Sequence, residues 1–105
     1  MNFQFELAGI SHRHKDYARA NVQRGDVLRL QCEPTNKFDP DAIMVFKGDI
    51  QIGYVPRTHT LPIKAAVQSE RATCLADAVW PRGCWVNVNI KPKETNEPTE
   101  DRAVA

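Results

Sequence analysis

The stretch from residue 43 to residue 55 constrains the fold most, because a very short polar connection separates two apolar segments. The segments are 43–46 (Ile-Met-Val-Phe) and 50–55 (Ile-Gln-Ile-Gly-Tyr-Val), and they flank Gly48 and Asp49. A glycine at the first position of a two-residue loop adopts a positive φ without steric cost, as a type II′ turn requires. We therefore predict an antiparallel β-hairpin here.

Other short segments alternate apolar and polar side chains, and this period of two is typical of half-buried β-strands. These predicted strands are residues 3–8, 26–33, 72–79 and 85–90. We expect the last two to form a second antiparallel hairpin, joined by the four residues 80–83 (Trp-Pro-Arg-Gly). In the last of them we expect Val86, Val88 and Ile90 to face inward, and Trp85, Asn87 and Asn89 outward.

Two segments favour helices. In residues 61–69, Thr60 is the predicted cap and Pro62 fits a first turn, where the missing N–H needs no partner. A shorter helix is predicted from Tyr17 to Val22, with Asp16 as its cap.

Strands and helices in this order do not alternate as β-α-β, which excludes a doubly wound parallel sheet. We predict a mainly β fold with two short helices, folded as a small closed β-barrel of about six strands. Closure is expected because it removes the exposed edges of so few strands.

The chain of 105 residues is the length of a single domain, and its charge is unevenly distributed. Residues 94–105 contain 4 acids and 1 base, a net charge of −3, whereas residues 1–93 carry 13 bases and 9 acids, a net charge of +4. We expect a domain over residues 1–92 and a disordered acidic tail over residues 93–105. A surplus of four positive charges is only a weak indication of a polyanionic ligand.

Three cysteines, Cys32, Cys74 and Cys84, are too few and too widely spaced for a disulfide framework. We therefore expect reduced thiols, with Cys32 and Cys74 in the core, and a cytoplasmic location. No apolar run approaches the roughly 18 residues that cross a bilayer, and the N-terminus does not resemble a signal peptide.

The densest polar stretch is residues 33–43, Glu-Pro-Thr-Asn-Lys-Phe-Asp-Pro-Asp-Ala-Ile, between two predicted strands. In one interpretation Asn36, Asp39 and Asp41 only build a turn, while Phe38 fills one end of the barrel. In the other this is a recognition loop, in which the ring meets a flat ligand and a carboxylate accepts a donor.

Four segments, taken in order, resemble the HIRAN domain, which occurs at the N-terminus of certain remodelling ATPases and as short bacterial proteins. They are Gly9-Ile10-Ser11-His12-Arg13, Gly25-Asp26-Val27-Leu28-Arg29-Leu30, the stretch 33–43, and Ile52-Gly53-Tyr54-Val55-Pro56-Arg57. The resemblance implies an OB-like (SH3-like) β-barrel that binds single-stranded DNA and captures a free 3′ end.

The resemblance also implies roles for individual residues. Asp39 would accept the 3′-hydroxyl hydrogen, Phe38 would stack on the terminal base, and Asn36 would brace or contact the same nucleotide. Tyr54 and Arg57 would contact phosphates. Arg13, with His12 beside it, is the nearest match to an arginine that follows the first strand in characterised members.

Elementary electrostatics agrees with this assignment. Stacking on an aromatic ring tolerates any base, because every base has a π-face. A carboxylate repels a phosphodiester but accepts a hydrogen bond from a terminal hydroxyl. Asp39 beside Phe38 therefore favours the end of a strand over its middle.

Two weaker signals remain in the sequence. Trp80 and Trp85 flank a basic turn, and they either extend a stacking surface or pack at the end of the barrel. His12 and His14 would lie on one side of an extended segment, but zinc needs further ligands such as His59 or a cysteine. We therefore predict no metal and no cofactor.

No phosphate-binding glycine loop and no nucleophile elbow is present, so we do not expect an enzyme. The sequence predicts a monomeric module that binds single-stranded DNA at 3′ ends, in repair or replication-fork processing, with a helicase or nuclease as a possible partner protein. The alternative is a protein-interaction module that recruits a DNA-processing or phage-encoded enzyme. No membrane association is expected.

Overall fold

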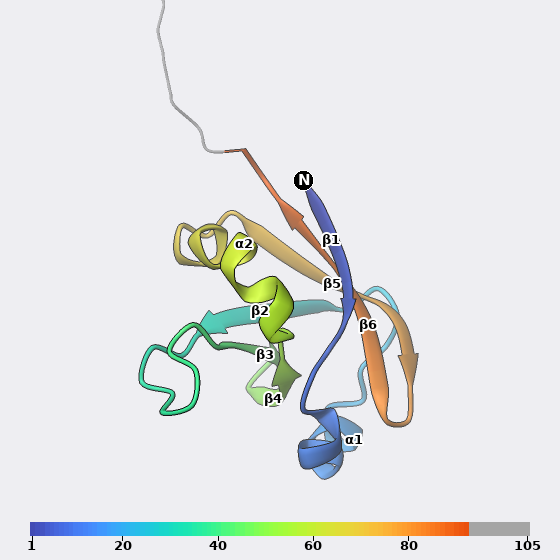
Figure 1. Cartoon of the computed structure of the whole chain (residues 1–105). Coiled ribbons are helices and arrows are strands. Elements are labelled where there is room, and N and C mark those ends of the chain that lie inside the picture. Colours follow the sequence, from blue (N-terminus) through green and yellow to red (C-terminus); the bar gives the residue numbers. More distant parts are fainter. Residues whose placement is uncertain (93–105) are drawn as a thin grey trace, which may run out of the picture.

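The computed structural model describes residues 1–92 and contains one antiparallel sheet of six strands with two α-helices and a short 3-10 helix (Figure 1). The elements are β1 Asn2–Glu6, η1 Ile10–Arg13, α1 His14–Ala20, β2 Val27–Cys32, β3 Ile43–Lys47, β4 Ile50–Tyr54, α2 Arg57–Gln68, β5 Ala72–Trp80 and β6 Gly83–Ile90. The strand order is β1-β6-β5-β2-β3-β4, and each neighbouring pair is antiparallel. The predicted acidic tail, residues 93–105, lies outside the described residues.

The sheet curls into an OB-like half-barrel, which confirms the predicted mainly β, OB-like fold with two short helices, although one isolated bridge takes the place of the continuous ladder of a closed barrel. Its two edge strands approach each other where the chain leaves β1, and one isolated bridge joins Ala8 to Tyr54. Each of these residues donates its N–H to the other's carbonyl oxygen at 2.8 Å. Gly53 makes this approach possible, because a Cβ there would lie 2.7 Å from the Ala8 carbonyl oxygen.

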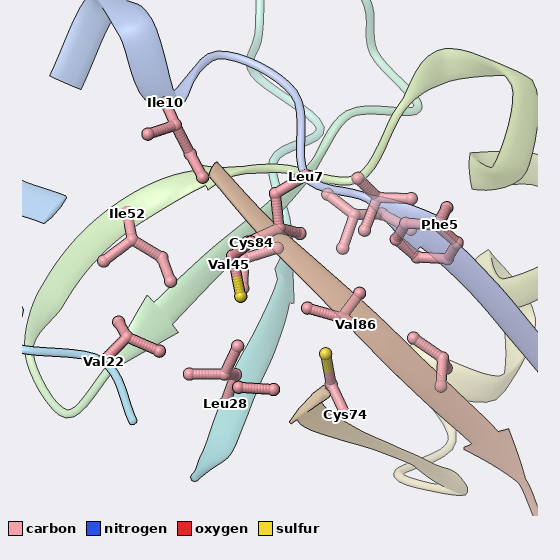
Figure 2. Close-up of a cluster of buried hydrophobic side chains, with 14 of the residues drawn as sticks. Phe5, Leu7, Ile10, Val22, Leu28, Val45, Ile52, Cys74, Cys84 and Val86 are labelled. Carbon is pink, nitrogen blue, oxygen red and sulfur yellow. The ribbon is translucent and has the colours of Figure 1, made fainter. Parts of the chain in front are cut away.

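The core lies inside this curve and is formed mainly by alternate residues of the strands (Figure 2). Val86 and Val88 are fully buried, as predicted, and Trp85 faces outward. The thiols of Cys74 and Cys84 point into the same cluster. Burial raises the pKa of Cys74 to about 12 and that of Cys84 to about 11, so both thiols are protonated at neutral pH. Cys32 is only partly buried and packs against the core.

Both predicted hairpins are confirmed. The β3–β4 turn consists of Gly48 and Asp49, and Gly48 has a φ of +58°. The β5–β6 loop is shorter than the predicted four residues, because Trp80 and Gly83 pair within the strands. The Trp80 indole covers Gly83, where a Cβ would lie 2.3 Å from Nε1 of the indole. The absence of a side chain at residue 83 thus lets the hairpin close tightly.

The predicted start of the second helix was wrong. α2 begins at Arg57, directly after Pro56, whose extended backbone ends the preceding strand segment. Thr60 is therefore not the cap: it is buried inside the helix, and its hydroxyl donates to the Arg57 carbonyl oxygen at 3.1 Å. Pro62 also lies inside the helix rather than in its first turn.

The first helix also starts earlier than predicted. α1 begins at His14, directly after η1, and Asp16 lies in its first turn instead of capping it. The Asp16 carboxylate accepts a hydrogen bond from Arg19 at 3.1 Å, so it stabilises the helix from within. Among residues 1–92, no helix has the length and apolar character needed to cross a bilayer.

Candidate functional site

The loop between β2 and β3 is held by its own polar side chains. Asn36 Oδ1 accepts the backbone N–H groups of Phe38 and Asp39, both at 2.9 Å. Asp39 Oδ1 in turn accepts the N–H of Asp41 at 3.0 Å. These are the hydrogen bonds expected if the polar side chains build the turn, and they hold the backbone at and after Phe38.

The Phe38 ring does not fill an end of the barrel. It is 93% exposed, which makes it the most exposed of the large apolar side chains in residues 1–92. A single exposed apolar side chain is common on protein surfaces, but one presented by a hydrogen-bonded loop is available for contact with a ligand. The two interpretations therefore apply to different residues: the polar side chains build the turn, and the turn presents the ring.

The Phe38 ring borders a cleft of about 300 Å³ between the loop, the end of β4 and the start of α2. The cleft is lined by Ala8, Asn36, Phe38, Asp39, Ala42, Tyr54, Val55 and Arg57. Five of the eight site residues predicted from the sequence are thus brought together. We call this space the Phe38 cleft.

Two ion pairs connect the loop to α2. The Arg57 Nε lies 3.7 Å from Asp39 Oδ2, and Lys64 Nζ donates a hydrogen bond to Asp41 Oδ1. The hydrogen bond to Asp41 raises the pKa of Lys64, which stays charged at neutral pH. Arg57 is 83% exposed, whereas Asp39 is only 19% exposed. The arginine therefore keeps most of its donors free for a ligand while it lies against the carboxylate.

Glu33 is a structural residue of the cleft that the sequence analysis did not single out. Its Oε1 accepts hydrogen bonds from the Tyr54 hydroxyl at 2.9 Å and from Asn36 Nδ2 at 2.8 Å. This shared acceptor joins the loop to the end of β4. The signal in the sequence was a carboxylate at the end of a predicted strand, next to a turn, but its partner Tyr54 is distant along the chain.

The other three predicted site residues do not line the Phe38 cleft. His12 and Arg13 lie in η1, which begins shortly after Ala8, and Arg13 Nη1 lies 4.0 Å from Asp16. Trp85 is 37% exposed on β6 and pairs with Glu6 of β1.

The histidine segment is helical, not extended, so the predicted geometry of His12 and His14 was wrong. His59 packs against Phe5, with ring centroids 4.8 Å apart. In the part of the chain that the structure describes, no group of three metal-ligating side chains comes together.

Comparisons with known proteins agree with this geometry. The family model described as the HIRAN domain matches residues 1–91. The structure is similar to a crystal structure of a protein from Lactobacillus plantarum, with a TM-score of 0.71, 16% identity, and coverage of 84% of this chain and 95% of that chain. It is also similar to the crystal structure of the HIRAN domain of human HLTF, with a TM-score of 0.69, 14% identity, and coverage of 83% and 72%. At these identities the structural similarity establishes the fold alone. No curated protein matches the chain.

Proposed function

The chain belongs to the HIRAN domain family, whose members are generally nucleic-acid-binding modules rather than catalysts, and we propose that this one binds single-stranded DNA by its free 3′ end. The proposed binding site is the Phe38 cleft. The observation that carries the proposal is an exposed aromatic ring on a loop with a hydrogen-bonded backbone, next to a carboxylate that has one oxygen outside the turn.

Phe38 supplies the stacking surface. A nucleobase that stacks on an aromatic ring gains about 1–3 kcal/mol, and the gain does not depend strongly on which base it is. A ring that is 93% exposed has a free face for this contact without any rearrangement of the loop.

Asp39 supplies the preference for an end. Its Oδ1 is used by the Asp41 N–H, whereas Oδ2 has only the loose contact with Arg57. Oδ2 is therefore able to accept a hydrogen bond from a terminal hydroxyl. A phosphate in the same place would meet the negative charge of the carboxylate.

Arg57 supplies a phosphate contact one step from the terminus. Its guanidinium is mostly in solvent and presents several donors in a plane, an arrangement that suits phosphate oxygens. The Tyr54 hydroxyl already donates to Glu33, so Tyr54 contributes its ring to the cleft and not a hydroxyl donor to phosphate.

The cellular role is proposed on the same basis. A monomeric, cytoplasmic module that captures 3′ ends suits DNA repair or replication-fork processing, with a helicase or nuclease partner supplying catalysis. Trp85, His12 and Arg13 lie outside the Phe38 cleft and are proposed only as contacts to a longer strand.

The decisive experiment replaces Asp39 by Asn, which keeps the Oδ1 acceptor of the turn and removes the charge. We expect Asp39→Asn to weaken binding of a 3′-hydroxyl oligonucleotide by about 10- to 150-fold, because a hydrogen bond to a charged group is worth about 1.5–3 kcal/mol. Binding of the same oligonucleotide with a 3′-phosphate should stay unchanged or become stronger. Fluorescence anisotropy measures both affinities.

The matched control is Asp49→Asn, which removes the same charge from the exposed β3–β4 turn. It should leave the ratio of the two affinities unchanged. Equal losses for both oligonucleotides in Asp39→Asn would remove Asp39 from the proposed role. A protein that binds neither oligonucleotide at low salt would favour the protein-interaction alternative, since nucleic-acid affinity is greatest there.

A further inference from the structure

The helix that borders the Phe38 cleft carries basic residues and no carboxylate. Arg57, His59 and Lys64 are the ionisable side chains of α2, which spans Arg57–Gln68. Arg57 and Lys64 are two turns apart, so they lie on the same side of the helix. Each of them already faces a loop carboxylate, Asp39 or Asp41, but the Arg57 side chain stays 83% exposed, so its guanidinium is the cation on this side that remains most accessible.

A second groove lies at the other end of the same helix. It has a volume of about 350 Å³ and is lined by Met1, Pro62, Ala65, Ala66, Arg71, Ile90, Lys91 and Pro92. Arg71 donates to the uncharged acceptors Ser69 Oγ and the Lys91 carbonyl oxygen, both at 2.8 Å. Within residues 1–92 neither Arg71 nor Lys91 forms an ion pair with a carboxylate. We call this space the Arg71 groove.

The Arg71 groove lies where the described part of the chain ends, since Lys91 and Pro92 form part of its wall. Figure 1 shows this end of β6 close to the start of β1. The 13 residues that follow, 93–105, carry the acids Glu94, Glu97, Glu100 and Asp101 and the bases Lys93 and Arg102, a net charge of −2. Residues 1–92 carry 12 bases and 9 acids, a net charge of +3.

We infer that residues 93–105 bind along α2, from the Arg71 groove toward Arg57, and compete there with the phosphates of a nucleic acid. The competition rests on the proposed function, whereas the contact itself rests on charge and position alone. The carboxylates of the segment pair with Arg71, Lys91 and Arg57. The segment is thus an internal regulator of the Phe38 cleft.

The length of the segment is sufficient for this path. Pro62, on the wall of the Arg71 groove, is five residues from Arg57, which is a rise of about 8 Å along the helix axis and a rotation of about 140° around it. Thirteen extended residues span up to about 43 Å. A tethered segment has an effective concentration of the order of millimolar, so individually weak ion pairs are enough for competition.

The test keeps the full chain and neutralises the segment with Glu97→Gln, Glu100→Gln and Asp101→Asn together. We expect this triple variant to bind a 3′-hydroxyl oligonucleotide about fivefold more tightly at low salt, a typical size for coupling between two binding events. The difference should shrink as salt rises, because exposed ion pairs are screened. Fluorescence anisotropy at several salt concentrations measures both effects.

The matched control is Glu6→Gln, Asp49→Asn and Asp77→Asn together, which removes three exposed acids elsewhere in the chain. It changes the net charge equally and should give a clearly smaller gain in affinity. Equal gains in the two triple variants would overturn the inference, because they would show a general charge effect. No gain in the tail variant would overturn it as well.

A second measurement does not depend on nucleic acid. Backbone amide NMR spectra of the wild-type chain and the tail variant should differ at α2, Arg71 and Lys91. If no oligonucleotide binds, the proposed function fails, and these shifts alone decide whether the segment contacts α2. Identical spectra in this region would overturn the contact.

Discussion

Replacing Phe38 by Ala separates binding from folding, because the structure gives this ring almost no role in the core. Its side chain is 93% exposed, so truncation leaves no cavity and removes little buried apolar surface. We expect the free energy of unfolding to change by no more than about 0.5 kcal/mol, the usual range for surface substitutions. A urea titration followed by circular dichroism measures this quantity.

The affinity should respond very differently. Loss of one stacked base costs about 1–3 kcal/mol, which corresponds to a reduction of about 5- to 150-fold in affinity for a 3′-hydroxyl single strand. The reduction should be similar for oligonucleotides that end in any of the four bases. A strong dependence on one base would indicate hydrogen-bonded readout instead of stacking.

Asn36→Ala provides the matched contrast in the same loop. It removes the acceptor of two backbone N–H groups and the donor to Glu33, so stability should fall by about 2 kcal/mol or more. Affinity should fall too, because the ring loses its fixed position. If Phe38→Ala instead unfolds the protein, or leaves affinity unchanged, our account of the loop is wrong.

Two further predictions concern the stability of the fold. Gly53→Ala should lower the free energy of unfolding by about 1–3 kcal/mol, because the new Cβ would lie 2.7 Å from the Ala8 carbonyl oxygen and the backbone would have to shift. Thermal unfolding measures this change, and unchanged stability would contradict the close approach at the bridge. The hydrogen bond from Lys47 holds the pKa of Asp26 below its usual range, so this carboxylate stabilises the fold above its unfolded-state pKa and ceases to do so as pH falls through the folded-state value. Asp26→Asn should therefore be less stable than wild type at neutral pH. This difference in stability should begin to narrow below about pH 4, the usual pKa of an aspartate, and a difference that does not narrow in acid would contradict the assignment.

The strands were predictable because their side chains alternate, and this local pattern determines which face is buried. The Gly48-Asp49 turn was predictable for a second local reason, because a two-residue hairpin loop can adopt few backbone conformations. The helix starts were not. Thr60 is a residue type that often caps a helix, but α2 begins about one turn earlier, directly after Pro56. Thr60 therefore lies within the helix, where its hydroxyl donates to the Arg57 carbonyl oxygen.

The cleft was predictable to the extent that its residues come from two short motifs. The loop before β3 and the junction of β4 with α2 supply Asn36, Phe38, Asp39, Tyr54 and Arg57. The contact of Glu33 with Tyr54 depends on how β2 and β4 lie in the finished sheet, which spacing along the chain does not reveal. The positions of Arg13 and Trp85 depend on the curvature of the sheet in the same way.

The bridge between Ala8 and Tyr54 has a consequence for local opening of the sheet. Two hydrogen bonds hold together the first and fourth strands, and both residues also line the Phe38 cleft. A ligand in the cleft therefore contacts both sides of the bridge that joins the two edge strands. Amide hydrogen exchange at Ala8 and Tyr54 should slow when the cleft is occupied, so these two amides give a direct measure of ligand binding.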